Sequence, residues 1–400
     1  MTTAPRFASA LSTHRNPEAA AREALENLDQ DLAGHSASLV VAFATPHFDA
    51  IQDQLGPRLR AATGADVVAG CTGERVLASG REVEEGPGLA LFAVAGGSKD
   101  LRLASFHVRA RPQGEGRFAF EGLPQIADPA KSSLLVFADP FSFPASEFLR
   151  TLDERYPGLP AIGGMASGGT GPGTLRLMHE GGAYSEGALC IVLEGGLGLH
   201  PVVSQGCRPV GDPFVITKVD RNMLLKLGGK QAAYALHETL ENLPEDEASL
   251  FRRGPFLGLA VDANKSQFER ADFLVRGVLG LHRETGSIAI SDDTIRPGMT
   301  VQFLVRDPES AGDDLTQLLQ TEAGGALAED ALPNSAGALV FSCNGRGKRM
   351  FGEAHHDASR VENALGQPIP TAGFFAMGEI GPVGGRNFLH GFTASVAVLR

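Results

Sequence analysis

The chain has 400 residues, of which 43% are hydrophobic and 20% charged, a balance typical of a globular protein with room for two domains. Its formal net charge of -12 argues against a nucleic-acid backbone or an anionic membrane as the main partner. Residues 1–7 lack the apolar core of a signal peptide, and no apolar run is long enough to span a bilayer. We therefore expect a cytoplasmic protein.

The first predicted elements are a short apolar run at 7–11 and a helix at about 17–33, capped by Ser12 or Thr13 and ended by Gly34. After them, one order of elements occurs three times: a strand, a helix, a second strand, a glycine-containing turn and a last strand. The spacing of the first two strands suits a parallel β-α-β crossover. Copy one has a strand at 38–44, a helix at 48–62, a second strand at 65–69, a turn at 70–74 and a last strand at 88–94. In copy two these elements lie at 133–138, 145–155, 160–162, 163–169 and 187–193. In copy three they lie at 338–342, 357–365, 371–375, 376–385 and 393–399.

The sequence thus predicts an α/β protein with repeated β-α-β-β units and mixed sheets flanked by helices, although chance similarity of short apolar runs is the alternative. The pattern changes between copies two and three. We expect two domains, 1–197 with copies one and two and 198–400 with copy three. The intervening elements are predicted to be short strands within 201–219, a helix at 224–243, a strand at 256–261, a meander over 273–306, a helix at 308–321 and a loop at 323–335.

The strongest candidate site lies in copy three. Its first strand runs into Ser-Cys-Asn-Gly-Arg at 342–346, and its second strand runs into a turn that carries Glu379. Because neighbouring parallel strands end at one sheet edge, we expect Arg346 and Glu379 to face one concave spot. There Arg346 would bind a carboxylate and Glu379 an ammonium group, as in an amino acid. The alternative is that the two side chains pair with each other. The apolar wall of the pocket would come from Phe374, Phe375 and Met377.

The four cysteines lie far apart and form no C-x-x-C pair, so we expect reduced thiols, no metal site and no cofactor. Cys71 and Cys343 each end an apolar strand, beside Thr72 and Asn344. Arg346 would lower the pKa of Cys343, but neither motif contains a histidine to act as a base. Packed, unreactive thiols are therefore favoured over a nucleophile.

Two further motifs receive structural interpretations. The glycine-rich run at 163–169 lacks the Lys-Ser/Thr of a P-loop and is predicted to be a tight turn, with a ligand-facing loop as the alternative. His355 and His356, with Glu353 and Asp357 beside them, look metal-binding. Adjacent helical residues point about 100° apart, so a solvated helix start is favoured.

The copy-three motifs also carry a family resemblance. Phe-Ser-Cys-x-x-Arg-Gly at 341–347 and Gly-Phe-x-x-x-Gly-Glu-Ile-Gly-Pro at 373–382 resemble the C-terminal half of the FIST family. Gly-Cys-Thr-Gly-Glu at 70–74 is similar to the signature of its N-terminal half, with one small residue fewer than the family often has. The resemblance extends over about residues 30–400. The candidate ligand-binding residues are Arg346, Glu379, Cys343, Asn344, Phe374 and Met377 in copy three, and Cys71, Thr72 and Glu74 in copy one.

The resemblance implies an intracellular sensory or signal-transduction protein, not an enzyme, that binds a small polar ligand such as an amino acid. It also implies a separate output protein, because no signalling module is attached. Two alternatives stay open. A cysteine-dependent enzyme would use Cys71 or Cys343, and an interaction scaffold, as in the family's F-box member, would expose an apolar patch.

Overall fold

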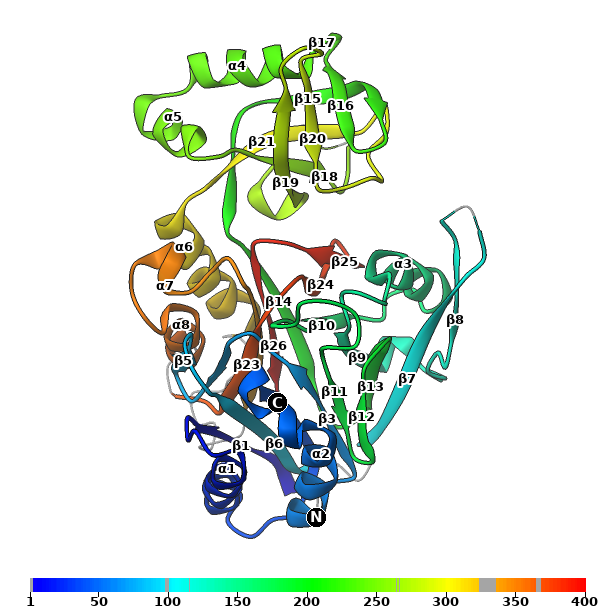
Figure 1. Ribbon diagram of the computed structural model, residues 1–400, viewed down its shortest axis with the longest axis vertical. Coiled ribbons are helices and arrows are strands. Elements are labelled where there is room, and N and C mark those ends of the chain that lie inside the picture. Colours follow the sequence, from blue (N-terminus) through cyan, green and yellow to red (C-terminus); the bar gives the residue numbers. More distant parts are fainter. Residues whose placement is uncertain are drawn as a thin grey trace. The chain divides into compact units, whose positions relative to one another are not determined.

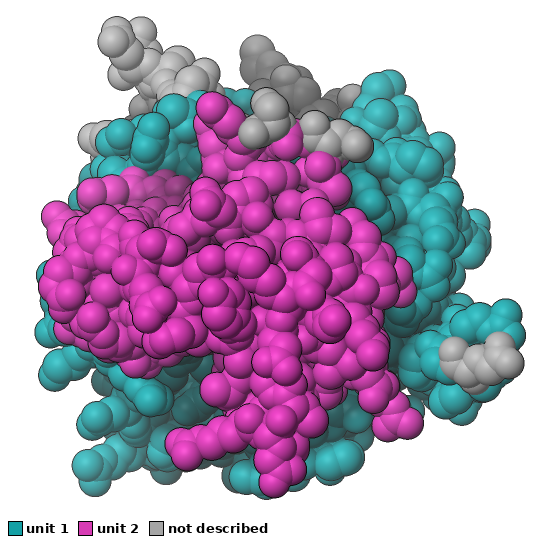
Figure 2. All heavy atoms as spheres, turned by 90° about the horizontal axis from the view of Figure 1, so that it is seen from above, with its two compact units in different colours: residues 1–203, 315–389, 393–400 teal, residues 204–314, 390–392 magenta. Residues whose placement is uncertain are grey.

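The computed structural model describes residues 3–97, 101–114, 116–263, 265, 267–323, 336–364 and 368–400. Most of the predicted loop at 323–335 lies outside these ranges. The chain forms two compact units, coloured in Figure 2. Unit 1 contains residues 1–203, 315–389 and 393–400, and unit 2 contains residues 204–314 and 390–392.

Unit 1 contains three mixed sheets, each built on one copy of the repeat (Figure 1). In every copy the first strand pairs parallel with the second and antiparallel with the last. The predicted repeat is confirmed. The sheet of copy one has, in spatial order, β1 (Thr3–Ser12), β6 (Leu89–Gly97), β2 (Ala37–Ala44), β3 (Val67–Thr72), β11 (Leu177–His179) and β12 (Gly182–Tyr184). The sheet of copy two has β25 (Arg386–His390), β24 (Glu379–Val383), β10 (Ala161–Met165), β9 (Ser132–Ala138), β13 (Ala188–Glu194), β7 (Arg102–Pro112) and β8 (Phe118–Glu121). The sheet of copy three has β14 (Leu199–Gln205), β26 (Thr393–Leu399), β22 (Gly337–Cys343), β23 (Thr371–Ala376), β4 (Val76–Ala78) and β5 (Arg81–Val83).

Helices cover one face of each sheet, and the opposite faces share a single apolar cluster. On the first sheet lie α1 (Pro17–Leu32) and α2 (Asp49–Thr63), and on the second lies α3 (Ala145–Arg155) (Figure 1). The third sheet packs against α8 (His356–Ala364) and the end of α6 (Pro308–Leu318). Among the described helices, none is long and apolar enough to cross a membrane.

The N-terminal elements differ slightly from the prediction. The apolar run expected at 7–11 is part of the ten-residue strand β1. The cap of α1 is Asn16, whose side chain accepts from the backbone N–H of Ala19, instead of Ser12 or Thr13. The helix ends at Leu32, and both its C-cap residue Ala33 and the following Gly34 have positive φ angles, of 52° and 78°. Any of several polar residues before Pro17 satisfies the capping pattern, so the sequence alone does not select Asn16.

A hairpin is exchanged between the copies. After its second strand, each copy forms a hairpin that pairs with the second strand of a different copy. The β4–β5 hairpin of copy one joins β23, the β11–β12 hairpin of copy two joins β3, and β24 of copy three joins β10. The three exchanges close a ring.

This exchange explains why the compact units do not follow the predicted boundary between residues 197 and 198. Residues 76–83 complete the sheet of copy three, and residues 379–390 extend that of copy two. Copy three therefore belongs to the same unit as copies one and two. Sequence periodicity finds the copies, but it does not show which copy each hairpin joins.

The three copies meet at an aromatic centre. Phe43, Phe137 and Phe341 occupy the same register position in their first strands, and their ring centroids lie 5.5, 6.3 and 6.0 Å apart. All three side chains are fully buried. On each second strand, the residue just before the one that pairs with the phenylalanine is a glycine, at position 70, 163 or 373. A Cβ at any of these positions would lie only 1.8–1.9 Å from a carbonyl oxygen of the first strand.

Unit 2 is a separate sheet with an additional pairing between β15 and β16. The predicted helix at 224–243 is wrong in its first part, which forms β16 and β17, because Gly228 and Gly229 turn the chain with positive φ angles of 55° and 82°. The helix proper starts at Ala232. The elements are β15 (Cys207–Asp220), β21 (Thr300–Arg306), β18 (Phe256–Ala260), β19 (Phe273–His282), β20 (Ser287–Ile290), β16 (Met223–Leu227), β17 (Lys230–Gln231), α4 (Ala232–Asn242) and α5 (Glu245–Arg252).

The aromatic centre predicts a large stability effect. Phe341→Ala should lower the free energy of unfolding by about 3–5 kcal/mol, because it leaves a cavity among rings from all three copies. Phe141→Ala is the matched control, since Phe141 is 37% exposed and should lose far less. Urea unfolding measures both, and equal losses would contradict the central role of Phe341.

Candidate functional site

The loop after β22 buries an ion pair. The Arg346 guanidinium donates to both carboxylate oxygens of Asp357, through Nε at 2.7 Å and Nη2 at 2.8 Å, and both side chains are fully buried. The Ser342 hydroxyl donates to the same carboxylate at 2.6 Å. Arg346 also stacks on Phe351 of the short helix α7 (Lys348–Phe351), 5.0 Å from the ring centroid. Arg346 Nη1 has no hydrogen-bond partner among the described residues.

This geometry corrects two sequence interpretations. Asp357 does not lie at a solvated helix start, because the hairpin of copy one covers it. Glu82 on β5 accepts from the backbone N–H groups of Asp357 and Ala358 at 2.9 and 3.0 Å. The alternative of an ion pair between Arg346 and Glu379 is also wrong, since Asp357 is the carboxylate that Arg346 binds.

The two histidines belong to the same network. His356 is buried, contacts Asp357 through Nδ1 at 2.9 Å and stacks on Phe351 with centroids 3.4 Å apart. His355 Nδ1 accepts from the backbone N–H of Glu82 at 2.9 Å. Among the described residues, no group of three His, Cys, Asp or Glu side chains is arranged to hold a metal ion.

Glu379, the first residue of β24, is a second fully buried ionisable group. Its Oε2 accepts from the backbone N–H and the hydroxyl of Thr393 at 3.1 and 2.8 Å, whereas Oε1 has no hydrogen-bond partner among the described residues. Burial raises the pKa of Glu379 to about 8, although Thr393, Cys343 and Arg346 all act to lower it. The carboxyl is therefore mostly protonated at neutral pH.

Comparison of the copies shows why Glu379 is unusual. It faces Gly164 across the exchanged pairing, at the register position where Val76 faces Phe374 and Leu177 faces Cys71. Val76 and Leu177 are fully or almost fully buried apolar residues. Copy three alone therefore places a carboxyl group where the other two copies place core side chains.

A second position in copy three differs in the same way. Ser395 pairs with Phe341, whereas the equivalent partners of Phe43 and Phe137 are Ala90 and Leu189. Ser395 is fully buried and its hydroxyl has no hydrogen-bond partner among the described residues. Glu379 and Ser395 of copy three are thus buried polar groups inside an otherwise apolar framework.

Cys343 is another residue of copy three with polar neighbours. It is the last residue of β22, is partly exposed, and its sulfur accepts a weak hydrogen bond from the N–H of Gly345 at 3.5 Å. The thiol lies near enough to Glu379 and Arg346 to affect the pKa of both. We define the polar cluster as Cys343, Arg346, Asp357, Glu379, Thr393 and Ser395.

The remaining predicted site residues lie elsewhere. Cys71 is fully buried, which raises the pKa of its thiol well above the usual range. Phe374 belongs to the aromatic centre, with its ring 5.0 Å from that of Phe43. The side chain of Met377 is 49% exposed, and Phe375 is buried beneath the Arg75 guanidinium, 4.7 Å away.

The predicted turns of the copies meet through hydrogen bonds between side chains and backbone groups. Ser167 donates its hydroxyl to the carbonyl of Phe375 and accepts from the N–H of Glu74 at 2.8 Å. Thr72 is buried and donates to Gln52 at 2.7 Å, and the carbonyl of Asn344 accepts from Arg75 at 2.5 Å. The run at 163–169 thus makes structural contacts with the turns of the other two copies.

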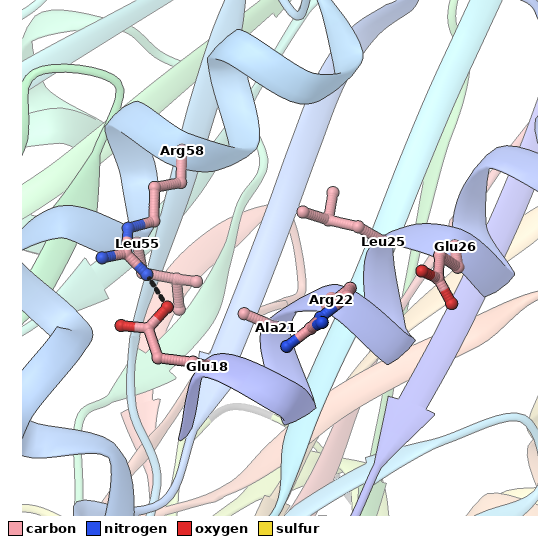
Figure 3. Close-up of a pocket in the computed structure, with 7 residues that line it drawn as sticks. All are labelled: Glu18, Ala21, Arg22, Leu25, Glu26, Leu55 and Arg58. Carbon is pink, nitrogen blue, oxygen red and sulfur yellow. Dashed lines mark hydrogen bonds and ion pairs between the residues drawn. The ribbon is translucent and has the colours of Figure 1, made fainter. Parts of the chain in front are cut away.

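A hollow in unit 1 lies at a different place. About 410 Å³ in volume, it lies between α1 and α2 (Figure 3). Glu18 and Arg58 form an ion pair across it, and both are more than one-third exposed, so the pair contributes little stability. None of the predicted site residues is there, and its lining lacks buried, unpartnered polar groups. It is formed by Glu18, Ala21, Arg22, Leu25, Glu26, Leu55 and Arg58.

Comparison with known families agrees with the sequence motifs. A FIST N domain matches residues 38–230, and a FIST C domain matches residues 232–382. The chain belongs to the FIST family. FIST domains are sensory and signal-transduction domains. Arg346 and Glu379 both fall in the FIST C region, which starts 34 residues after the predicted boundary (232 against 198).

Relatives extend over almost the whole FIST chain. Uncharacterized protein Mb0898c of Mycobacterium bovis is 37% identical over 395 residues, 98% of each chain. Uncharacterized protein Rv0628c of Mycobacterium tuberculosis is 36% identical, over 98% of this chain and 99% of its own. A cyanuric acid hydrolase from A. caulinodans is similar at a TM-score of 0.25 and 12% identity over 99% of both chains, values too low to support an argument.

The buried ion pair predicts a non-additive stability effect. Arg346→Ala should cost about 3–5 kcal/mol, because it leaves the Asp357 carboxylate buried without its cation. The double variant Arg346→Met/Asp357→Leu should cost less than the single variant, since no charge is left unpaired. Chemical denaturation decides this, and a double variant that loses the sum of both single effects would contradict the account.

Glu379 predicts a pH dependence of stability. Its pKa is about 8 in the folded protein against an ordinary 4.5, so the folded state holds the extra proton between these values. Stability should therefore fall as pH rises from about 5 to 8. Glu82, whose pKa burial and the nearby Asp357 raise to about 7, adds to this fall. Against Glu379→Gln, which retains the Glu82 contribution, the wild type should lose about 1.4 kcal/mol more per pH unit in urea titrations. Parallel pH profiles would contradict the burial of a neutral Glu379.

Proposed function

We propose that this FIST protein senses a small polar ligand at the polar cluster and passes the signal to a separate output protein. One observation carries the proposal. Arg346 Nη1 and Glu379 Oε1 are completely buried and have no hydrogen-bond partner among the described residues. They belong to a cluster that includes positions where the other two copies carry apolar side chains.

Energetics favour a ligand over an empty cluster. A buried polar group without a partner costs about 1–3 kcal/mol, and a ligand that supplies the missing contacts recovers part of that cost. Arg346 is held rigidly by Asp357, so it offers its remaining N–H group without further loss of side-chain entropy. A carboxylate is the natural acceptor for that N–H group.

An amino acid fits both ends of the site. Its carboxylate would accept from Arg346, and its ammonium group would donate to the Glu379 carboxylate. Because Glu379 is neutral when buried, binding an ammonium group would lower its pKa and release a proton. Affinity for an amino acid should then rise with pH up to about 8.

Titration calorimetry tests the proposal. A thermal-shift screen of the twenty amino acids selects a probe, whose affinity is then measured at pH 6.5 and 8.5. Glu379→Gln should weaken binding by roughly 10- to 150-fold, the equivalent of about 1.5–3 kcal/mol, and should remove the pH dependence. Glu284→Gln is the control, because Glu284 is exposed and is not a candidate ligand-binding residue, so it should not alter affinity. Unchanged affinity in a folded Glu379→Gln protein, or no binding of any amino acid, would contradict the amino-acid assignment.

A scaffold function is favoured by a separate feature of unit 2. The side chains of Leu279 and Leu281 on β19 are 65% and 50% exposed. Contiguous exposed apolar patches mark sites of protein contact. Loss of an output protein's binding in Leu279→Glu, with ligand affinity unchanged, would assign the output surface to this strand.

A further inference from the structure

We propose that Phe392 couples unit 2 to the Glu379 carboxyl group, so that the hydrogen bonds of Glu379 set the local stability of strands β18 and β19. The proposal goes beyond ligand sensing, because it does not depend on the identity of a ligand. Phe392 lies where β25 leads into β26. Residues 390–392 belong to unit 2, so the chain returns to unit 1 at the peptide bond between Phe392 and Thr393.

That peptide group is hydrogen-bonded on both sides. Its carbonyl, from Phe392, accepts from the backbone N–H of Gly206 at 2.9 Å. Its N–H, from Thr393, donates to Glu379 Oε2 at 3.1 Å, and the Thr393 hydroxyl donates to the same oxygen at 2.8 Å. Because a peptide group is planar, it rotates as one body. Glu379 and Gly206 together therefore fix the backbone orientation at Phe392.

The side chain of Phe392 packs within unit 2. Its ring lies edge-on to that of Phe256, with centroids 4.5 Å apart and an interplanar angle of 63°. The Arg306 guanidinium lies 4.8 Å from the Phe392 ring and 5.6 Å from the Phe256 ring. Edge-to-face and cation–π contacts both depend on where the rings lie. A rotation of the backbone at Phe392 would therefore disturb Phe256.

The backbone of Phe392 is in an unfavourable conformation. Its φ angle is 67°, in the left-handed region that bulky residues seldom adopt. By register, its equivalents in copies one and two are Pro87 and Glu186, neither of which has a positive φ angle. Such a conformation persists only where the surrounding contacts enforce it. Phe392 should therefore relax when one of those contacts is removed.

The contact with Glu379 is specific to copy three. At the position of Thr393, copies one and two carry Gly88 and Gly187. The N–H of Gly88 donates to the Thr45 hydroxyl at 3.0 Å, and that of Gly187 donates to the Ser142 hydroxyl at 2.9 Å. Both hydroxyls come from the loop after the first strand of their own copy. Copy three instead uses a carboxyl group on β24, so the repeat itself does not require Glu379 there.

Phe256 connects this contact to the strand with the exposed leucines. It is the first residue of β18 and pairs with Gly277 on β19. Gly277 lies two residues before Leu279, whose side chain is 65% exposed. A displacement of Phe256 would thus weaken β19 next to the surface considered above for an output protein.

Hydrogen–deuterium exchange of the full-length chain tests the coupling, with peptides from β18 and β19 as the readout. Glu379→Leu removes both hydrogen bonds to Thr393 and should raise exchange in these strands at least about fivefold. Glu379→Gln retains an acceptor oxygen and should leave exchange within about twofold. Leu177→Ala is the matched control. Leu177 is the buried equivalent of Glu379 in copy two and forms no side-chain hydrogen bond, so this variant should also stay within about twofold.

A double-mutant cycle separates coupling from a purely structural role of the ring. Phe392→Gly removes the ring and tolerates the positive φ angle, so exchange in β19 should rise in this variant alone. In that background, Glu379→Leu should add less than about twofold, because the connection to Phe256 is already lost. Phe392→Tyr retains the ring and should preserve the full response to Glu379→Leu.

Three results would overturn the proposal: unchanged β19 exchange in folded Glu379→Leu, an equal rise in Leu177→Ala, or full additivity in the Phe392→Gly background. If Glu379→Leu does not fold, Thr393→Val replaces it. This variant loses the hydroxyl bond to Glu379 and should raise exchange at least about threefold. The proposed function fails separately. Amino-acid binding without coupling overturns this inference alone, whereas coupling without amino-acid binding overturns only the proposed ligand.

Discussion

The contact among Phe43, Phe137 and Phe341 is the constraint on which the rest of unit 1 depends. Each ring comes from the end of a first strand, so the ends of three parallel β-α-β units are brought to one place. Loops that follow those strands are thereby fixed near one another, and so are the turns after the second strands. The position of Cys343, two residues beyond Phe341, is a direct result.

The same arrangement allows each residue of the polar cluster to be compared with its equivalents in the other two copies. In an approximately threefold arrangement, equivalent positions have nearly equivalent surroundings, and two of the copies supply reference side chains for the third. Glu379 and Ser395 stand out against Val76, Leu177, Ala90 and Leu189. Carboxyl and hydroxyl groups in such surroundings cost stability. Copy three is therefore the copy that carries buried polar groups at positions where the other two copies are apolar.

Much of the fold follows from local sequence patterns. The three repeats have alternating apolar runs, helical spacing and glycine turns, and each of these depends on neighbours within about 40 residues. The exchange of hairpins depends on pairing between residues as distant as Val76 and Phe374, for which no local pattern exists. The helix predicted at 224–243 is wrong in its first part, because the apolar run at 223–227 is compatible with both a helix and a strand. The turn at Gly228-Gly229 makes this run a strand.

The candidate site shows the same limit. Arg346 and Glu379 follow strands of one copy, so parallel pairing indicated that both would lie near one sheet edge. Asp357 was recognised as acidic and near a helix start, but its burial depends on Glu82, 275 residues away in sequence. Ser395 carried no signal, because a serine in an apolar strand is unremarkable until its equivalents in the other copies are aligned by register.

Because the exchanged hairpins form a closed ring, no sheet of unit 1 can be completed by its own copy alone. Each sheet of unit 1 lacks one edge until another copy supplies it, and the sheet of copy two is finished by residues 379–390, near the C-terminus. During synthesis, the sheet of copy two must therefore keep an open edge until residues 379–390 have left the ribosome. The same rule, applied to a single repeat, would be satisfied by three separate chains in a trimer, each lending its hairpin to the next.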